Sequence, residues 1–223
     1  MYKLISYPLK EDDAVWPGCF TVAVEPVNCM SRGEAFNTFV FKMSNHFGTH
    51  FDAPRHFVAD GTPIGELPME RFIYERPLLL DIPKGSMEKI EAEDLAAHAK
   101  EIEKCDLLMI RTGFSKYRDE DKETYCERGP AVSSRAAKYL LDNFTGLKAL
   151  ALDMLSLASY SDGEDGTLSH QYMLGAHHDH FVCIIEDVDM RELTPGKIKR
   201  VFAAPVFVVG LDSSPVTVLA EVE

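Results

Sequence analysis

The segment from Ser44 to Phe57, SNHFGTHFDAPRHF, concentrates residue types that bind metal ions and transfer protons. His46, His50 and His56 fall within eleven residues of a chain that has 8 histidines, whereas an even distribution would place about 0.4 there. Asp52 adds a carboxylate to the same stretch. Either this segment is a solvated loop that is rich in histidine by chance, or its side chains converge on something that needs imidazole.

The spacing within this segment shows what convergence would require. In an extended strand, the backbones of His46 and His50 would lie about 13 Å apart, but two imidazoles on one ion bring their nitrogens within roughly 3–4 Å. The chain must therefore bend between them, and a turn at Gly48 is favoured over a helix because Pro54 follows closely. His50 and Asp52 are two residues apart and point to the same side of an extended chain. The segment predicts a metal site, with a solvated histidine-rich loop as the alternative.

Composition limits the classes of protein to which the chain can belong. Its 223 residues are 46% hydrophobic and 26% charged, with a net charge of −13, so we expect neither nucleic acid nor an anionic membrane as partner. The five cysteines are scattered without a CxxC pair, which argues against disulfides and thiolate zinc sites and favours the cytoplasm. The N-terminus does not resemble a signal peptide, and no apolar run reaches the roughly 20 residues of a membrane span.

The elements that must position these side chains are mostly strands. Hydrophobic runs bounded by turn residues predict strands at 1–10, 17–27, 34–44, 76–83, 106–113, 147–157, 181–188, 200–210 and 215–222. Helical patterns cover 86–106 and 133–144, the second capped by Ser133 or Ser134. Many strands with two or three helices between them predict one α/β domain over residues 1–223.

The predicted strand at 34–44 leads directly into the histidine segment. Phe36, Thr38 and Val40 alternate with Asn37, Phe39 and Phe41, so apolar side chains occupy both of its faces. Such a pattern is expected for a strand that is covered on two sides.

The sequence HFGTHFDAPRHF, residues 46–57, resembles the HxGTHxDxPxHF signature of the cyclase family, which contains bacterial kynurenine formamidases and isatin hydrolases. Shorter matches extend along nearly the whole chain: ISYPL and WPG near the N-terminus, LLMIRTGF, LALDMLSL, and PVTVLAEV as the last strand. The resemblance implies a single α/β domain of the swivelling β/β/α type, with a β-barrel-like mixed sheet and outer helices. It also implies a homo-oligomer, expected to be a homodimer or homotetramer.

The resemblance implies that His46, His50 and Asp52 are metal ligands, together with a second cluster of a histidine and a later glutamate. The matching residues are His170 in HQYML and Glu186 in CIIEDV. The interval between these two is a few residues longer than the family pattern. The extra length contains HHDH, so His177, His178 or His180 could supply the nitrogen in place of His170.

Two further residues receive roles from the resemblance. His56 would be the general base, with a hydrogen-bonding histidine behind the ligands as the alternative. Trp16, the single tryptophan, would face the substrate, and an ordinary core tryptophan is the alternative. Glu186 follows the apolar run Val182 to Ile185, so a buried carboxylate there would need a cation as partner; an exposed position at the strand end is the alternative.

Imidazole and carboxylate ligands without thiolate suit Zn²⁺ or Mn²⁺. Five ligands exceed the three or four that one catalytic zinc takes. Two ions bridged by Asp52 are therefore expected, with a single ion as the alternative. The activity that the resemblance implies is hydrolysis of a small-molecule substrate, an amide, lactam or lactone, with N-formylkynurenine as one candidate. A cyclase or dehydratase that uses the ion as a Lewis acid and a non-catalytic metal-binding protein are the rival hypotheses.

Overall fold

The computed structural model describes residues 1–223, and its centre is one mixed sheet of nine strands. The strands are hydrogen-bonded in the order β5-β12-β13-β4-β11-β10-β8-β6, and β1 pairs with β13. Their bounds are β1 Tyr2–Leu4, β4 His50–Asp52, β5 Ile73–Tyr74, β6 Pro77–Asp81, β8 Leu107–Arg111, β10 Ala149–Leu152, β11 Cys183–Glu186, β12 Ile198–Pro205 and β13 Ser213–Val222. β6, β8, β10 and β11 run parallel, whereas β4 is antiparallel to both β11 and β13.

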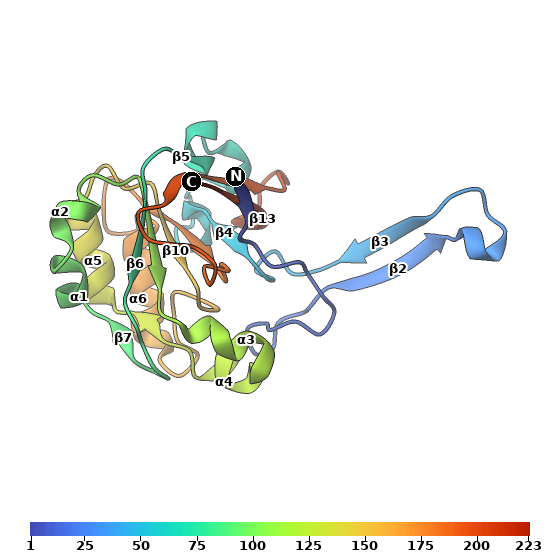
Figure 1. Cartoon of the computed structure of the whole chain (residues 1–223), viewed down its shortest axis with the longest axis horizontal. Helices are drawn as coiled ribbons and strands as arrows, with labels where there is room; N and C mark the ends of the chain where they lie inside the picture. Colours follow the sequence, from blue (N-terminus) through green and yellow to red (C-terminus); the bar gives the residue numbers. More distant parts are fainter.

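The sheet curls until β12 contacts β6, which lies at the far end of the strand order (Figure 1). Leu107 and Met109 of β8 point into one core, inside the curl, while Leu108 and Ile110 point into a second core under the helices. Both faces are therefore covered, which explains the unbroken apolar runs of the parallel strands. The predicted α/β class with a barrel-like mixed sheet is confirmed.

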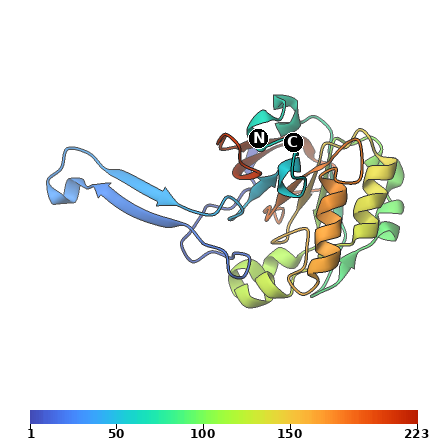
Figure 2. The same ribbon diagram turned by 180° about the vertical axis from the view of Figure 1, so that it is seen from behind.

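Helices cover the outer face of the parallel strands (Figures 1 and 2). α5, Ser134–Asn143, matches the predicted helix, and Ser133 caps it by accepting a hydrogen bond from the Ala136 N–H. The predicted helix over 86–106 is divided instead into β7 (Lys89–Ile90), α1 (Ala92–Ala96) and α2 (Ala99–Ile102). The remaining helices are α3 (Tyr117–Glu120), α4 (Lys122–Glu127) and α6 (Gly163–Met173); β9 (Ala131–Val132) pairs with β7. No helix has both the length and the apolar composition needed to cross a bilayer.

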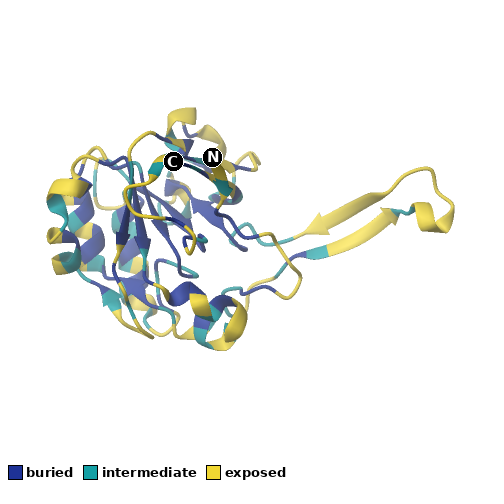
Figure 3. Cartoon of the chain, viewed as in Figure 1, coloured by how far each residue is buried: buried dark blue, intermediate teal, exposed yellow.

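The predicted strands 17–27 and 34–44 form a separate hairpin that projects from the rest of the molecule (Figures 1 and 2). We call residues 23–42 the arm; it contains β2, Ala23–Asn28, and β3, Thr38–Lys42. Every residue of β3 is exposed (Figure 3). The expectation that this strand would be covered on both sides is wrong for the single chain, because β2 and β3 pair only with each other and lie apart from the main sheet (Figure 1).

Candidate metal centre

The histidine segment enters the middle of the sheet through a turn at Gly48. This glycine has φ +66°, a left-handed conformation that other residues rarely adopt, and β4 follows between β11 and β13. The register places Glu186 directly opposite His50. As a result, Nε2 of His50 lies 3.1 Å from Oε2 of Glu186, and both side chains are buried.

Two backbone carbonyls orient the buried imidazoles. Nδ1 of His50 lies 2.8 Å from the Gly48 carbonyl, and Nδ1 of His170 lies 2.8 Å from the Gly166 carbonyl. A carbonyl only accepts hydrogen bonds, so Nδ1 carries the hydrogen on each ring. Both Nε2 atoms then face Glu186, with His170 Nε2 at 3.5 Å from Oε1. A carbonyl that fixes the ring tautomer in this way is typical of histidines that bind metal.

Helix α6, which carries His170, was not predicted. Its first half contains Gly163 and Gly166, which weaken the helical pattern. A Cβ at Gly166 would lie 2.4 Å from Cβ of Ala158, so the glycine lets α6 approach the loop after β10. From that loop, Leu157 N and Ser156 Oγ donate to Oε1 of Glu186, at 2.5 and 3.0 Å.

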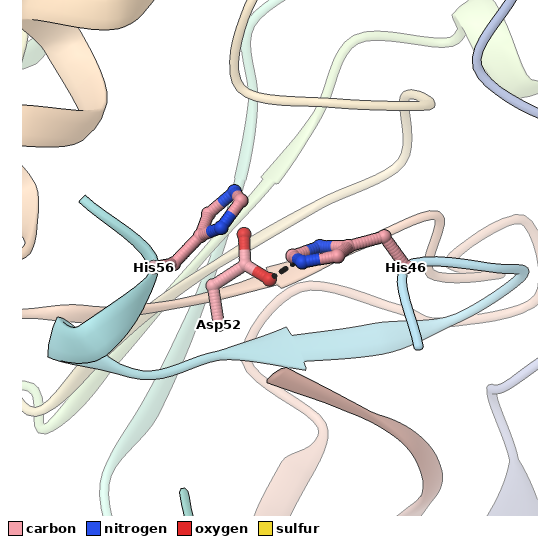
Figure 4. A group of neighbouring side chains, drawn as sticks. All are labelled: His46, Asp52 and His56. Carbon is pink, nitrogen blue, oxygen red and sulfur yellow. Dashed lines mark ion pairs between the residues drawn. The ribbon is translucent and has the colours of Figure 1, made fainter. Parts of the chain in front are cut away.

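A second group of side chains lies beside the first, around His46 (Figure 4). Nδ1 of His46 is 3.1 Å from Oδ1 of Asp52, and its Nε2 is 2.9 Å from Oδ2 of Asp212. Nδ1 of His56 lies 2.9 Å from the same Asp212 oxygen. Asp212 therefore links a predicted ligand to the predicted base. Sequence reasoning missed this residue, since it stands alone in a turn of ordinary composition; the one available signal is its place immediately before β13, which pairs with β4.

Charges in the centre shift the pKa values of the histidines. Burial lowers the pKa of His46, but Asp52 and Asp212 outweigh it and raise this pKa to about 10. Burial also opposes the charged form of His50, yet Asp52 and Glu186 raise its pKa above the ordinary value. Burial would raise the pKa of Glu186, whereas His170 and His50 hold it well below its usual range. These carboxylates thus stabilise positive charge at the centre.

Asp52 provides a test of whether the residues fit a cation. Both of its carboxylate oxygens are fully buried, and neither receives a hydrogen bond, although His46 Nδ1 lies 3.1 Å from Oδ1 without hydrogen-bond geometry. A buried carboxylate without donors is costly. Two sets of ligand atoms share Asp52: one with His46 and His56, the other with His50 and Glu186, and the atoms of each set lie within 4.8 Å of one another. This donor set fits a divalent metal ion.

The centre opens into a cavity of about 340 Å³. Its lining includes the predicted residues Trp16, His46, His50, His56, His170 and Glu186, while Asp52 lies buried below. Trp16 packs edge-to-face on Tyr160, with ring centroids 5.6 Å apart. Predicted site residues that are far apart in the sequence thus lie at one cavity.

The three histidines that were alternatives to His170 contact residues outside the metal centre. Nε2 of His177 lies 3.4 Å from Oε1 of Gln171, and Nε2 of His178 lies 3.4 Å from Oδ1 of Asp142. His180 lines a separate cavity beside Arg71. The structure places His170 next to Glu186, and these three elsewhere.

Comparisons with known proteins agree with this architecture. The family model described as "Putative cyclase" matches residues 4–159, which include Trp16 and the whole histidine segment. An uncharacterized protein of Haemophilus influenzae is 43% identical over 117 residues, covering 52% of this chain and 82% of the relative. The kynurenine formamidase of Bacillus cereus is 28% identical over 216 residues, covering 95% of this chain and 93% of the relative.

Solved structures share the fold. Isatin hydrolase A from Labrenzia aggregata, bound to benzyl benzoate, superposes with a TM-score of 0.82 and 22% identity, covering 100% of this chain and 93% of that one. Isatin hydrolase A from Ralstonia solanacearum gives a TM-score of 0.83 and 19% identity, covering 100% and 92%. The family model matches more than half of this chain, which therefore belongs to the cyclase family of metal-dependent hydrolases.

Proposed function

We propose that this protein hydrolyses a C–N amide bond in a small substrate, outside peptides, with a divalent metal at the centre described above. The observation that carries the proposal is Asp52, a buried carboxylate that receives no hydrogen bond and lies between His46 and His50 at the base of a cavity. The similarity to a kynurenine formamidase along almost the whole chain supports the same reaction class.

Five side chains would hold the metal: His46, His50, Asp52, His170 and Glu186. A divalent ion bound there would act as a Lewis acid, which activates water and polarises the substrate carbonyl. Zn²⁺ and Mn²⁺ both suit these ligands. Oδ1 of Asp52 lies 3.1 Å from Nδ1 of His46 and 3.6 Å from Nε2 of His50, which favours two ions bridged by the Asp52 carboxylate.

His56 is the proposed general base. Its Nδ1 donates to Asp212, so Nε2 remains free to accept a proton. The ring lines the cavity, from which Nε2 can take the proton of the attacking water and return it to the leaving nitrogen. This proton transfer completes hydrolysis without another titratable group.

The cavity suggests the kind of substrate. Trp16 and Phe57 line it together with the ligands, and aromatic walls favour a planar or aryl substrate. We therefore propose an aryl formamide such as N-formylkynurenine, or a lactam. We place the protein in the cytoplasm, since all five cysteines are free thiols.

The test is to load the purified protein with Zn²⁺ or Mn²⁺ and to assay formamides, lactams and lactones. We expect turnover of at least one amide, and loss of turnover by roughly 10²–10⁴-fold in His56→Ala with the metal retained. A metal-loaded protein that cleaves none of these compounds would support the non-catalytic alternative. Dehydration or cyclisation in place of hydrolysis would support the Lewis-acid cyclase.

A further inference from the structure

Arg118 of α3 is an arginine with almost no exposure to solvent. Its residue is 2% exposed, and its guanidinium binds Asp187 with two parallel bonds: Nε donates to Oδ1 and Nη2 donates to Oδ2, both at 2.8 Å. The third nitrogen, Nη1, donates to Oδ1 of Asp13 at 3.1 Å. One buried cation therefore holds two buried carboxylates that are far apart in the sequence.

The neighbours of these three side chains satisfy most of their remaining polar atoms. Tyr125 of α4 donates to Oδ1 of Asp187 at 2.7 Å, and the backbone N–H of Lys10 donates to Oδ2 of Asp13 at 3.1 Å. The ring of Tyr7 stacks on the guanidinium, with its centroid 3.8 Å from Cζ. Charges that are removed from water are tolerated when they are paired and hydrogen-bonded in this way.

Asp187 directly follows the proposed ligand Glu186, and its backbone is also fixed. It has φ +54°, a left-handed conformation that is uncommon outside glycine and persists where the surroundings hold it. Its N–H donates to the Met154 carbonyl at 2.9 Å, and its carbonyl accepts from the Thr49 hydroxyl at 2.5 Å. Thr49 precedes His50, which pairs with Glu186 in the register. The position of Asp187 thus constrains how Glu186 faces His50.

Asp13 belongs to a different wall of the cavity. It lies three residues before Trp16, which lines the cavity together with Cys19. We call residues 10–20 the Trp16 segment. No helix or strand includes these residues, and the segment lies beside α3 and α4 (Figures 1 and 2). The ion pair of Asp13 with Arg118 attaches the segment to α3.

Stability alone does not account for this arrangement. Apolar residues of similar volume can replace a buried ion pair at little cost, and often with a gain in stability. Apolar packing does not reproduce the direction of the bonds, because a planar guanidinium fixes each carboxylate at a defined angle. The two carboxylates fixed here belong to the Trp16 segment and to the residue next to Glu186.

We propose that Arg118 is a positioning residue for the reaction. Through Asp187 it fixes the metal ligand Glu186, and through Asp13 it fixes the Trp16 segment. This inference rests on the proposed function, which puts a metal at Glu186 and a substrate against Trp16. A substrate amide must meet the metal in a defined geometry, and a misplacement of about 1 Å can cost about 10²-fold in rate.

Two spectroscopic signals report on the two ends of this linkage separately. Trp16 is the only tryptophan of the chain, so tryptophan fluorescence and its quenching by acrylamide report on the Trp16 segment alone. Co²⁺ bound at the metal centre absorbs visible light in a way that depends on the geometry of its ligands, so its spectrum reports on Glu186. Neither signal requires turnover.

Substitutions that preserve side-chain size separate the two links. Asp13→Asn should raise the acrylamide quenching constant of Trp16 by about 2-fold or more. It should also raise KM for an aryl amide by about 3–10-fold, with kcat and the Co²⁺ spectrum as in the parent protein. Asp187→Asn should shift the Co²⁺ spectrum and weaken Zn²⁺ binding by about 10–100-fold. Arg118→Lys should change both signals, since an ammonium group cannot bind two carboxylates as a guanidinium does.

Tyr125→Phe is the matched control. It removes one buried hydrogen bond to Asp187 but leaves the guanidinium in place. We expect a lower thermal midpoint from this change, with both spectroscopic signals as in the parent protein. All variants are compared well below their thermal midpoints, with the fold checked by circular dichroism.

Parent-like quenching in Asp13→Asn would overturn the link to the Trp16 segment, and a parent-like Co²⁺ spectrum in Asp187→Asn would overturn the link to Glu186. These two variants decide the question even where Arg118→Lys does not fold. If Arg118→Lys folds and changes neither signal, or if Tyr125→Phe changes both to the same extent, Arg118 has only a structural role. A protein that cleaves no amide would refute the proposed function, whereas both signals would still decide the role of Arg118.

Discussion

Oδ2 of Asp212 lies 2.9 Å from Nδ1 of His56, and the same oxygen lies 2.9 Å from Nε2 of His46. One carboxylate thus orients a proposed base and a proposed ligand together. Asn45 fixes the other oxygen of Asp212 at 2.8 Å. This relationship would make Asp212 a positioning residue for the proposed reaction.

Replacement of this carboxylate should therefore reduce turnover. In Asp212→Asn the amide can still bond to both rings, but it no longer selects the His56 tautomer with a free Nε2. With excess metal present, we expect kcat to fall by about 10²–10⁴-fold while KM changes little. Asp212→Glu should recover part of the loss. Full kcat in Asp212→Asn would remove the residue from the mechanism.

His170 and His180 give a matched pair for the second ligand cluster. His170 faces Glu186 at 3.5 Å, whereas His180 lines another cavity. We expect His170→Ala to lose metal affinity by at least about 10–100-fold, and His180→Ala to keep the affinity of the parent protein. Titration of the metal-free variants with Zn²⁺ measures both, and the reverse order would reassign the ligand.

The close approach of α6 can be tested at its glycines. A Cβ at Gly166 would clash with Ala158 at 2.4 Å, whereas a Cβ at Gly163 meets nothing within 4 Å. Gly166→Ala should destabilise the protein by about 1–3 kcal/mol and weaken metal binding, because α6 carries His170. Gly163→Ala is the control and should be neutral or slightly stabilising. Equal denaturation midpoints for the two variants would contradict the close contact.

Cys105 should make stability fall at high pH. Burial raises the pKa of this thiol from 9.0 to about 12 in the folded protein. Above pH 9 the unfolded chain releases the proton while the folded chain retains it, so unfolding becomes more favourable as pH rises from 9 to 12. Between pH 8 and 10, this thiol is expected to lower the free energy of unfolding by about 1.4 kcal/mol. Denaturant titrations should show that the free energy of unfolding declines less with pH in Cys105→Ala than in the parent protein. An identical decline in both proteins would refute the contribution of Cys105.

The parts of the site that sequence could predict are those encoded in short, contiguous patterns. His46, His50, Asp52 and His56 share one segment, and the turn they require is at Gly48, as predicted. The strands were predictable because apolar runs and the turn residues that bound them are local properties. The family resemblance that the segment carries is confirmed by the match over residues 4–159.

Other parts depend on contacts between distant segments. Asp212 reaches the site because β13 pairs with β4, a register that no local pattern encodes. Helix α6 was missed because its glycines weaken the local signal, although Gly166 allows the close contact with Ala158. The strand at 34–44 was identified as a strand, but its exposure was not predicted, because apolar side chains on both faces do not show whether the rest of the chain covers them.

The central claim is that imidazoles and carboxylates from two distant segments, 46–52 and 170–186, bind divalent metal at a shared site. A crystal structure with bound zinc, with anomalous scattering recorded at the zinc edge, tests it most directly. We expect an anomalous peak about 2.0–2.2 Å from an oxygen of Asp52 and from a ring nitrogen of His50, with Glu186 turned toward it. An empty centre in a crystal soaked with excess zinc, with Glu186 directed away from His50, would contradict the account.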